Sequence, residues 1–548
     1  MAILPHPNRR KFASLAVVSV RFRGFCSYPR PCRCVVAILA RRVLRICINL
    51  DFGMSTSTPS DDPLLALFES DISLAAAQPI LALVAQYLAD TRSGDGPVST
   101  ARSPQEVADR LAGPMPRAST PLADVAARIS TLLLDDVNRL MHPMAVGHQV
   151  SAPLPATIWT ESLIAALNQS LAVQEMSPSF RPLERQVIRW CTELVGWGEH
   201  AGGTMTSGGT EATFTALLAA RSHCIPDVWT NGVGINPPVL VCGEHAHYAV
   251  TRAAGEMGLG LSRVEVIASC EHRMDVDALS ERLNALHAAG TRVMAVVATA
   301  GCTATGAFDD IDRIADVCAL HGNVWLHVDA AHGGAAMISA THQYRVRGIS
   351  RARSVAWDPH KTLLLPLSAG LLLMRDERDL QTAFAQTAPY LFAHDNSETR
   401  LWDSGTRTFQ CSRRSDVLKL WVAFERYGAD QLAAMYERLC NTASALYALL
   451  HTRTDFAPLH APESNILCFA WTPSGVAAAD RDELTDALRA RYNRSGRGWL
   501  TATTLDGRRV LRVTIMNVRT TPLHMRRLID GLADEGAAML AERNFASV

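Results

Sequence analysis

Lysine is scarce in this sequence of 548 residues: only Lys11, Lys361 and Lys419 occur, although basic residues number 53. Any chemistry that needs a lysine amine therefore has three candidates. The 53 acidic residues cancel the basic ones, and this balance argues against a nucleic-acid partner. No apolar run is long enough to span a bilayer. The 13 cysteines show neither metal-ligand spacing nor secreted-scaffold density, so we expect reduced thiols, no bound metal, no membrane partner and a cytoplasmic protein.

Residues 1–53 differ from the rest in composition. They contain ten basic residues and one acidic residue, Asp51. We interpret them as a basic extension, disordered or foreign to the native protein, so that the folded chain begins near Met54. The alternative is an organellar transit peptide, which is also rich in arginine and poor in acidic residues.

Hydrophobic patterning divides the remaining chain into three parts. Residues 54–142 show helical periodicity, and 413–548 combine helices with short strands, which predicts a small C-terminal α+β domain. Between them, in 143–412, amphipathic helices alternate with apolar strands, at 238–242, 293–298 and 324–328. One such helix should begin at Asp309, Asp310 and Asp312, because acidic residues favour a helix N-terminus. This alternation predicts an α/β domain with a mainly parallel sheet covered by helices on both faces.

The stretch TSGGTEATFTALLAAR, residues 206–221, places two glycines before a helix-forming run. Gly208 and Gly209 allow a close turn, while Thr210 and the free N–H groups of the helix start could hold an anion. An ordinary junction between loop and helix explains the pattern equally well. Neither a Walker loop nor a dinucleotide fingerprint is present.

Two further motifs carry ionisable residues in apolar settings. In HVDAAHGGA, Asp329 ends an apolar strand, where it could keep a ligand nitrogen protonated or merely cap a turn. In AWDPHKTLLLPL, Lys361 precedes an apolar run, and a desolvated lysine can act as a Schiff-base nucleophile. Lys419 lies in a helical stripe, where a snorkelling surface residue is the simpler interpretation.

Taken together, the motifs give an anion site, a strand-end acid and a buried lysine in one parallel-sheet domain. Pyridoxal 5′-phosphate needs a group of each kind: a phosphate cradle, a partner for its pyridine nitrogen and an amine. The combination is much more specific than any one member.

The sequence resembles the group II pyridoxal-phosphate amino-acid decarboxylases, which act on glutamate, cysteine sulfinate, 2,4-diaminobutyrate or aromatic amino acids. The resemblance extends over roughly 110–545 and rests on these motifs: HPMAVGHQV (142–150), TSGGTEA (206–212), HAHYAVTRAAG (245–255), HVDAAH (327–332), DPHKTL (358–363) and DSGTRTFQCSRRSDVLKLW (403–421). It implies the fold-type I, aminotransferase-like architecture and a homodimer.

The resemblance also implies residue roles. Lys361 would form the Schiff base, Asp329 would face the pyridine nitrogen, and His247 would stack on the ring. His245 competes for the stacking role. The remaining cofactor contacts implied by the resemblance are Gly209, Thr210, Thr303, Ala331 and His360, and the implied substrate contacts are Gln149 and Arg512. As bare sequence, Arg512 could equally be a salt-bridged strand residue.

Two departures from the family pattern stand out. The tyrosine that donates a proton after carbon dioxide leaves is replaced by Glu398, and the next aromatic position holds Trp402. The donor would then be Glu398, His247, Tyr390 or water. Asp358 stands where animal relatives often have Asn.

The resemblance thus implies decarboxylation of an L-amino acid, with an acidic or short polar substrate favoured by the DSGTRTFQC stretch. A carbon–carbon lyase or an aldehyde-forming oxidative decarboxylase is the alternative, because the loop tyrosine is missing. A non-catalytic cofactor-binding scaffold is a third interpretation, against which the complete set of Lys361, Asp329 and His247 argues.

Overall fold

The computed structural model describes residues 62–384 and 402–546. They fall into two units, which meet between Ser73 and Leu74. The first contains helix α2 (Pro63–Ser70), whose start is capped by Asp62, since its side chain accepts a hydrogen bond from the backbone N–H of Leu64. The predicted extension, 1–53, lies outside the described residues.

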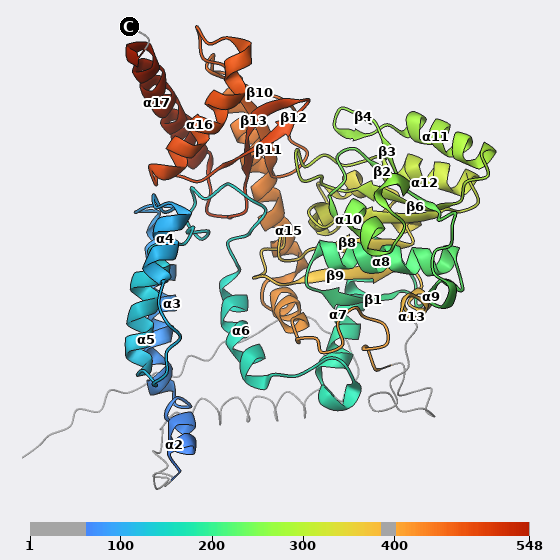
Figure 1. Cartoon of the computed structure of the whole chain (residues 1–548), viewed down its shortest axis with the longest axis horizontal. Helices are drawn as coiled ribbons and strands as arrows, with labels where there is room; N and C mark the ends of the chain where they lie inside the picture. Colours follow the sequence, from blue (N-terminus) through green and yellow to red (C-terminus); the bar gives the residue numbers. More distant parts are fainter. Residues whose placement is uncertain (1–61, 385–401, 547–548) are drawn as a thin grey trace, which may run out of the picture. The chain divides into compact units, whose positions relative to one another are not determined.

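A seven-stranded sheet organises the larger unit, in the order β1-β9-β8-β7-β6-β2-β3 (Figure 1). Strand β9 runs antiparallel to both neighbours, and the other pairs are parallel. The bounds are β1 (Gly202–Thr206), β2 (Val239–Gly243), β3 (Val264–Ile267), β6 (Val293–Thr299), β7 (Trp325–Asp329), β8 (Ser354–Trp357) and β9 (Gly370–Met374); β4 (Ser269–Cys270) and β5 (Arg273–Met274) form a separate small hairpin.

Helices cover both faces of this sheet because its strands are apolar on both sides. Leu371 and Leu373 of β9 belong to one buried cluster, whereas Leu372 and Met374 belong to the other. Helices α8 and α10 lie on the second face and α7, α11 and α12 on the first. This confirms the predicted α/β class. The helices are α7 (Phe180–Val195), α8 (Gly209–Cys224), α9 (Val228–Asn231), α10 (Ala249–Glu256), α11 (Val276–Ala288), α12 (Ile311–Leu320) and α13 (Arg378–Ala383).

Helices dominate the N-terminal part, as the periodicity predicts. They are α3 (Leu74–Ser93), α4 (Pro104–Leu111), α5 (Leu122–Ile129) and α6 (Pro155–Leu167). Helix α4 begins with a capping box, in which Ser103 and Glu106 satisfy each other's backbone N–H groups. Within the described ranges no single helix is long and apolar enough to cross a membrane, although α2 and α3 together meet the criteria of length and composition.

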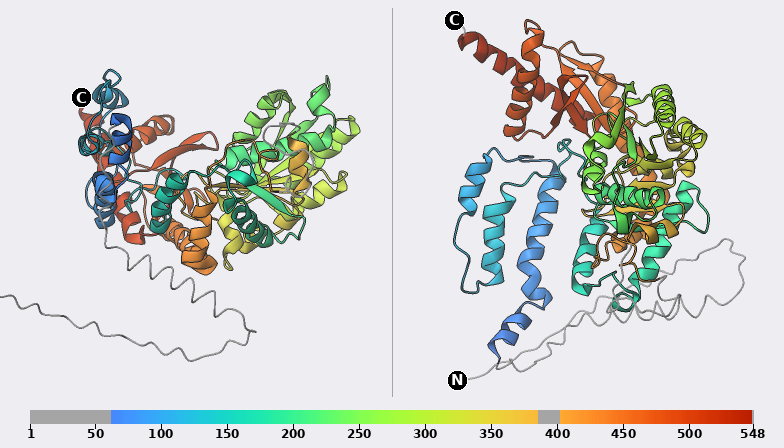
Figure 2. Two further views of the ribbon diagram at one scale, coloured as in Figure 1. Left: turned by 90° about the horizontal axis from the view of Figure 1, so that it is seen from below. Right: turned by 45° about the vertical axis from the view of Figure 1, so that its right-hand side comes forward.

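The C-terminal elements build a second, antiparallel sheet in the order β10-β11-β13-β12. Figure 2 shows these strands and their helices in orange and red. The bounds are α15 (Val417–Leu450), β10 (Phe456–Pro458), β11 (Ile466–Trp471), α16 (Arg481–Arg494), β12 (Thr501–Leu505), β13 (Arg508–Thr514) and α17 (Pro522–Ala546). Helix α15 is interrupted at Gly428, whose φ of 72° only glycine adopts readily. The domain boundaries at 142/143 and 412/413 stay predictions.

The snorkelling interpretation of Lys419 is wrong. Its side chain is fully buried, and Nζ lies 2.8 Å from Glu161 Oε1 and 2.9 Å from Asp416 Oδ1. Nζ also donates to the carbonyl of Ser368 at 2.6 Å. A buried ammonium is tolerated here because carboxylates and a carbonyl replace its water.

Candidate active site

A cavity of about 360 Å³ lies at the sheet edge where the parallel strands end. In an open α/β sheet, ligands bind at this edge. Five of the strands that end there are followed by a lining residue that the sequence singled out: Gly209 after β1, His247 after β2, Thr303 after β6, Ala331 after β7 and Lys361 after β8. Thr210 and His360 also line it, and Asp329 contributes from the last position of β7.

The proposed anion cradle is the start of α8. A Cβ at Gly209 would lie 2.8 Å from Ala331 Cβ and 3.0 Å from Asp358 Oδ2, so only glycine fits. The first N–H groups of a helix have no partner inside it. Glu211 braces the turn before α8, because its Oε2 accepts hydrogen bonds from the Ser207 backbone N–H at 2.8 Å and hydroxyl at 2.6 Å.

Asp329 is buried, with 7% of its surface exposed. Its Oδ1 accepts a hydrogen bond of 3.1 Å from the backbone N–H of Ala331. Burial raises the pKa of Asp329, while the positive charge of Lys361 and the hydrogen bond from Ala331 oppose that rise. A cation bound against this carboxyl would therefore favour its ionised form.

Lys361 follows a second buried acid, Asp358, by three residues. Its Nζ is 3.1 Å from Asp358 Oδ2, and the Asp358 side chain is 3% exposed. His360 Nε2 lies 3.6 Å from the same oxygen, while His360 Nδ1 accepts the backbone N–H of Ala369 at 3.1 Å. The proton of neutral His360 is thus on Nε2, facing Asp358. Burial lowers the pKa of His360, which favours this neutral form.

Of the two competing histidines, the structure places His247 in the cavity. Its Nδ1 accepts the backbone N–H of Ala249 at 3.2 Å, and its ring lies 4.1 Å from that of Tyr248. Burial lowers the pKa of His247, against the opposite influence of Asp329. His245 is instead within 3.1 Å of the Ser269 hydroxyl and does not line the cavity.

The two expected substrate residues, Gln149 and Arg512, are not among the residues that line this cavity. Arg512 on β13 donates from Nη1 to the carbonyl of Thr303 at 2.9 Å. Gln149 is two residues from Ser151, whose hydroxyl donates to the carbonyl of His360 at 3.0 Å. Both side chains keep a buried donor, Arg512 Nε and Gln149 Nε2, that has no hydrogen-bond partner among the described residues. Burial lowers the pKa of Arg512.

Sequence reasoning did not assign a role to His332, which also lines the cavity. Its Nε2 is 2.7 Å from Asn465 Oδ1, and burial lowers its pKa to about 3, so that it is neutral. The sequence did offer a signal for His332, because this residue lies in the HVDAAH motif, three residues after Asp329. Its partner Asn465 lies 133 residues away, which no local pattern reveals.

Glu398 and Tyr390 lie outside the described residues. The described segment that follows these two residues in the chain is held to α7 by a hydrogen bond and an ion pair. Arg181 Nε donates to the carbonyl of Trp402 at 2.7 Å, and Arg413 Nη2 pairs with Glu184 Oε2 at 2.9 Å. Although burial alone would raise it, the pKa of Glu184 falls to about 2 because Arg413 and Arg181 stabilise the carboxylate.

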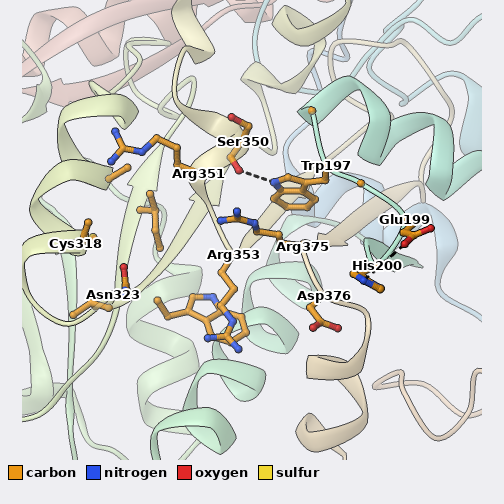
Figure 3. Close-up of a pocket in the computed structure, with 17 residues that line it drawn as sticks. Trp197, Glu199, His200, Cys318, Asn323, Ser350, Arg351, Arg353, Arg375 and Asp376 are labelled. Carbon is orange, nitrogen blue, oxygen red and sulfur yellow. Dashed lines mark hydrogen bonds and ion pairs between the residues drawn. The ribbon is translucent and has the colours of Figure 1, made fainter.

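A larger hollow, of about 990 Å³, lies at the opposite sheet edge, where β7 begins (Figure 3). None of the residues expected from the sequence lines it. Its arginines are largely neutralised: Arg353 Nε pairs with Asp379 Oδ2 at 2.9 Å, and Arg351 pairs with two acidic residues of α12. The smaller cavity is therefore the better candidate for catalysis.

Comparison with known proteins gives matches over most of the chain. The family described as "Pyridoxal-dependent decarboxylase conserved domain" matches residues 104–472. L-2,4-diaminobutyrate decarboxylase of Rhizobium meliloti (strain 1021) is 34% identical over 423 residues, which are 77% of this chain and 83% of that protein. Cysteine sulfinic acid decarboxylase of Rattus norvegicus is 34% identical over 338 residues, 61% of this chain and 68% of that protein.

Solved structures match as well. The glutamate decarboxylase domain of a Vibrio parahaemolyticus protein, described as diaminobutyrate-pyruvate transaminase and L-2,4-diaminobutyrate decarboxylase, has a TM-score of 0.73 at 27% identity, with 84% of this chain and 96% of that chain covered. Mouse CSAD has a TM-score of 0.79 at 27% identity, covering 87% and 99%. These matches agree with the fold-type I architecture that the family resemblance implies.

Proposed function

Because this chain belongs to the family of pyridoxal-dependent decarboxylases, we propose that it removes the α-carboxyl group of an acidic or short polar L-amino acid as carbon dioxide and leaves the amine. The predicted family, the enzyme class and the cofactor, pyridoxal 5′-phosphate, are confirmed by the matches above. One observation carries the residue assignment: Lys361, Asp329, His247 and the start of α8 line one cavity.

The residues present fit this cofactor. Ala331 and Asp358 pack closely against Gly209, and the free N–H groups at the start of α8, with Thr210, provide donors for a phosphate. Asp329 offers a buried carboxyl for the pyridine nitrogen, and Lys361 the amine. Thr303, Ala331 and His360 complete the contacts as lining residues.

When bound, the pyridoxal ring supplies a sink for the electron pair released as the carboxyl group leaves. The chain's own contribution is positioning and charge. Asp329 would face the ring nitrogen and favour its protonated form, because a neighbouring cation stabilises this buried carboxylate. Neutral His247, beside Tyr248, would cover a face of the ring without adding charge.

The substrate would be held by buried donors. Arg512 binds the α-carboxylate, and the amide of Gln149 binds the side chain; the unpartnered Arg512 Nε and Gln149 Nε2 support this assignment. Donors favour an acidic side chain over a cationic one. The relatives are named for both kinds, cysteine sulfinic acid and L-2,4-diaminobutyrate, so the choice needs measurement.

Incubation of the cofactor-loaded protein with a panel of amino acids tests the proposal, with product masses and carbon dioxide as readouts. The panel contains cysteine sulfinate, aspartate, glutamate, 2,4-diaminobutyrate and aromatic amino acids. We expect amine and carbon dioxide from an acidic or short polar member. Aldehyde as the main product would favour the oxidative alternative, and turnover of aromatic amino acids alone would contradict the substrate class.

Glu398 is proposed as the proton donor to Cα. It would need to be protonated, which a closed, water-poor site favours. Glu398→Gln should slow amine formation and increase aldehyde or ketone by-product, with cofactor absorbance unchanged. Glu199→Gln, at an exposed glutamate, is the control. Amine formation at the parent rate would shift the role to His247, Tyr390 or water.

We also propose that the enzyme is a homodimer that works in the cytoplasm. The dimer is supported by the family resemblance, and the cytoplasm by a cysteine pattern typical of reduced thiols. Size-exclusion chromatography with light scattering tests the dimer. The mass of a monomer would contradict this proposal. Fractionation of the source cells tests the compartment.

A further inference from the structure

We propose that the larger hollow, at the start of β7, binds a small aromatic anion: a flat ring that carries a carboxylate or a phosphate group. The hollow has a volume of about 990 Å³ and lies at the sheet edge opposite the catalytic cavity (Figure 3). Ligand pockets are typically concave and rich in aromatic side chains, with a few polar groups that fix the orientation of the ligand. The inference is independent of the proposed function, because no residue with a proposed catalytic, cofactor or substrate role lines the hollow.

Arg375 supplies the positive charge for this anion. Of the three arginines that line the hollow, Arg351 and Arg353 have the carboxylate partners described above. The guanidinium of Arg375 has neither an ion pair nor a hydrogen bond within 62–384 and 402–546. An arginine can bind a carboxylate or a phosphate through two parallel hydrogen bonds, so Arg375 is suited to either group.

The two acidic residues of the lining leave this charge uncompensated. Asp376 already has a cation, since its Oδ2 lies 2.6 Å from Arg378 Nη2. The side chain of Glu199 is 90% exposed, and water screens a charge at such a position. A bound anion would therefore be the direct counterion of Arg375.

Two tryptophans give the hollow its aromatic wall. Trp197 and Trp325 are 7% and 2% exposed. Their polar atoms already have partners: Trp197 Nε1 donates to the carbonyl of Ser350 and Trp325 Nε1 to the hydroxyl of Ser354, both at 2.8 Å. Neither indole needs a hydrogen bond from a ligand, so their contribution to the wall is carbon surface, which favours an apolar ring.

Arg353 adds a flat, rigidly held surface beside this wall. Its guanidinium carbon is 4.4 Å from the centre of the Trp325 ring, and Nε and Nη2 each donate to a carboxylate oxygen of Asp379 at 2.9 Å. The Arg353 side chain is nevertheless 31% exposed, so part of it can meet a ligand. Guanidinium planes stack on aromatic rings, and Arg353 can do so without giving up Asp379. The hollow thus offers a stacking surface for a ring and a free cation, Arg375, for its anionic group.

Isothermal titration calorimetry on the cofactor-loaded protein tests the inference, since the cofactor then occupies its own site. Naphthoate and naphthyl phosphate are the probes that carry both ring and charge. Naphthalenemethanol lacks the charge, and inorganic phosphate lacks the ring. Each probe is titrated into the parent protein, Arg375→Gln and Arg282→Gln. Arg282 is the matched control, because it is an arginine of α11 that pairs with Glu265 and does not line the hollow.

In the parent protein we expect one charged probe to bind about tenfold more tightly than naphthalenemethanol, because a hydrogen bond to a charged group contributes that much to affinity. The tighter of the two identifies the anion as carboxylate or phosphate. Arg375→Gln should remove the difference, and Arg282→Gln should keep it. If Arg375→Gln fails to fold, the comparison of probes in the parent protein still decides.

Three results would overturn the inference. The first is equal affinity of Arg375→Gln and the parent for the charged probes. The second is no binding of either charged probe at about 1 mM, the weak end of ligand affinities. The third is inorganic phosphate that binds as tightly as naphthyl phosphate, because the ring would then contribute nothing.

Discussion

Lys361 is the accessible lysine amine in the described part of the chain, because Lys419 is enclosed by Glu161 and Asp416. Lys361→Ala should therefore abolish turnover and the visible absorbance of bound cofactor. Absorbance spectra and product assays measure both. Lys361→Arg, which keeps the positive charge beside Asp358, should be equally inactive; activity in either variant would contradict the assignment.

Asp329 is proposed to act on the cofactor through its charge, whereas Lys361 forms a covalent bond to it. Asp329→Ala should leave cofactor bound but reduce the rate by about 100-fold or more, as losses of preorganised charge in buried sites do. Cofactor content and initial rates, measured on one preparation, separate the two effects. Asp124→Ala, at an exposed acid of α5, should behave as the parent protein does. An unchanged rate in Asp329→Ala would remove this residue from the mechanism.

At the scale of elements, Glu184 joins α7 to β1 and to the segment after the proposed loop donor. It accepts the backbone N–H of Met205 at 3.0 Å and pairs with Arg413 and Arg181. Removing one member of such a buried network leaves uncompensated charges, so Glu184→Gln should lower the free energy of unfolding by about 3–5 kcal/mol. Denaturant unfolding followed by tryptophan fluorescence measures it, with Glu193→Gln on the exposed face of α7 as control.

The same carboxylate predicts a pH dependence. Its folded-state pKa of about 2 lies below the ordinary value of 4.5, so its stabilisation is complete above about pH 4.5 and is lost as pH falls toward 2. Unfolding curves at pH 6 and pH 3 should differ more for the parent protein than for Glu184→Gln. An equal difference in both proteins would assign the acid sensitivity to other groups.

The sequence predicts the elements that depend on local pattern. Strands β2, β6 and β7 lie within one residue of the predicted runs, because parallel strands buried on both faces are apolar throughout. Helix α12 begins after Asp310, whose side chain accepts the N–H of Arg313. Lys419 was misjudged, and Glu184 was not singled out, because one partner of each is distant in sequence: Lys419 pairs with Glu161, and Glu184 and Arg413 are 229 residues apart.

At the scale of the whole molecule, the basic extension should be dispensable. A chain that starts at Met54 should keep its fold and activity, because the sheet, the cavity and the C-terminal elements all come from later residues. Circular dichroism, size-exclusion chromatography and activity assays check this. Loss of soluble protein on truncation would show that residues 1–53 have a structural role.

The enclosure of Lys419 has a practical consequence for covalent labelling. In the chain that starts at Met54, two lysines remain, and one of them is fully buried between carboxylates. An amine-selective reagent would then modify the α-amino group and Lys361, whose side chain is 18% exposed. Because bound cofactor occupies Lys361, the mass added by labelling would report the fraction of molecules that lack cofactor.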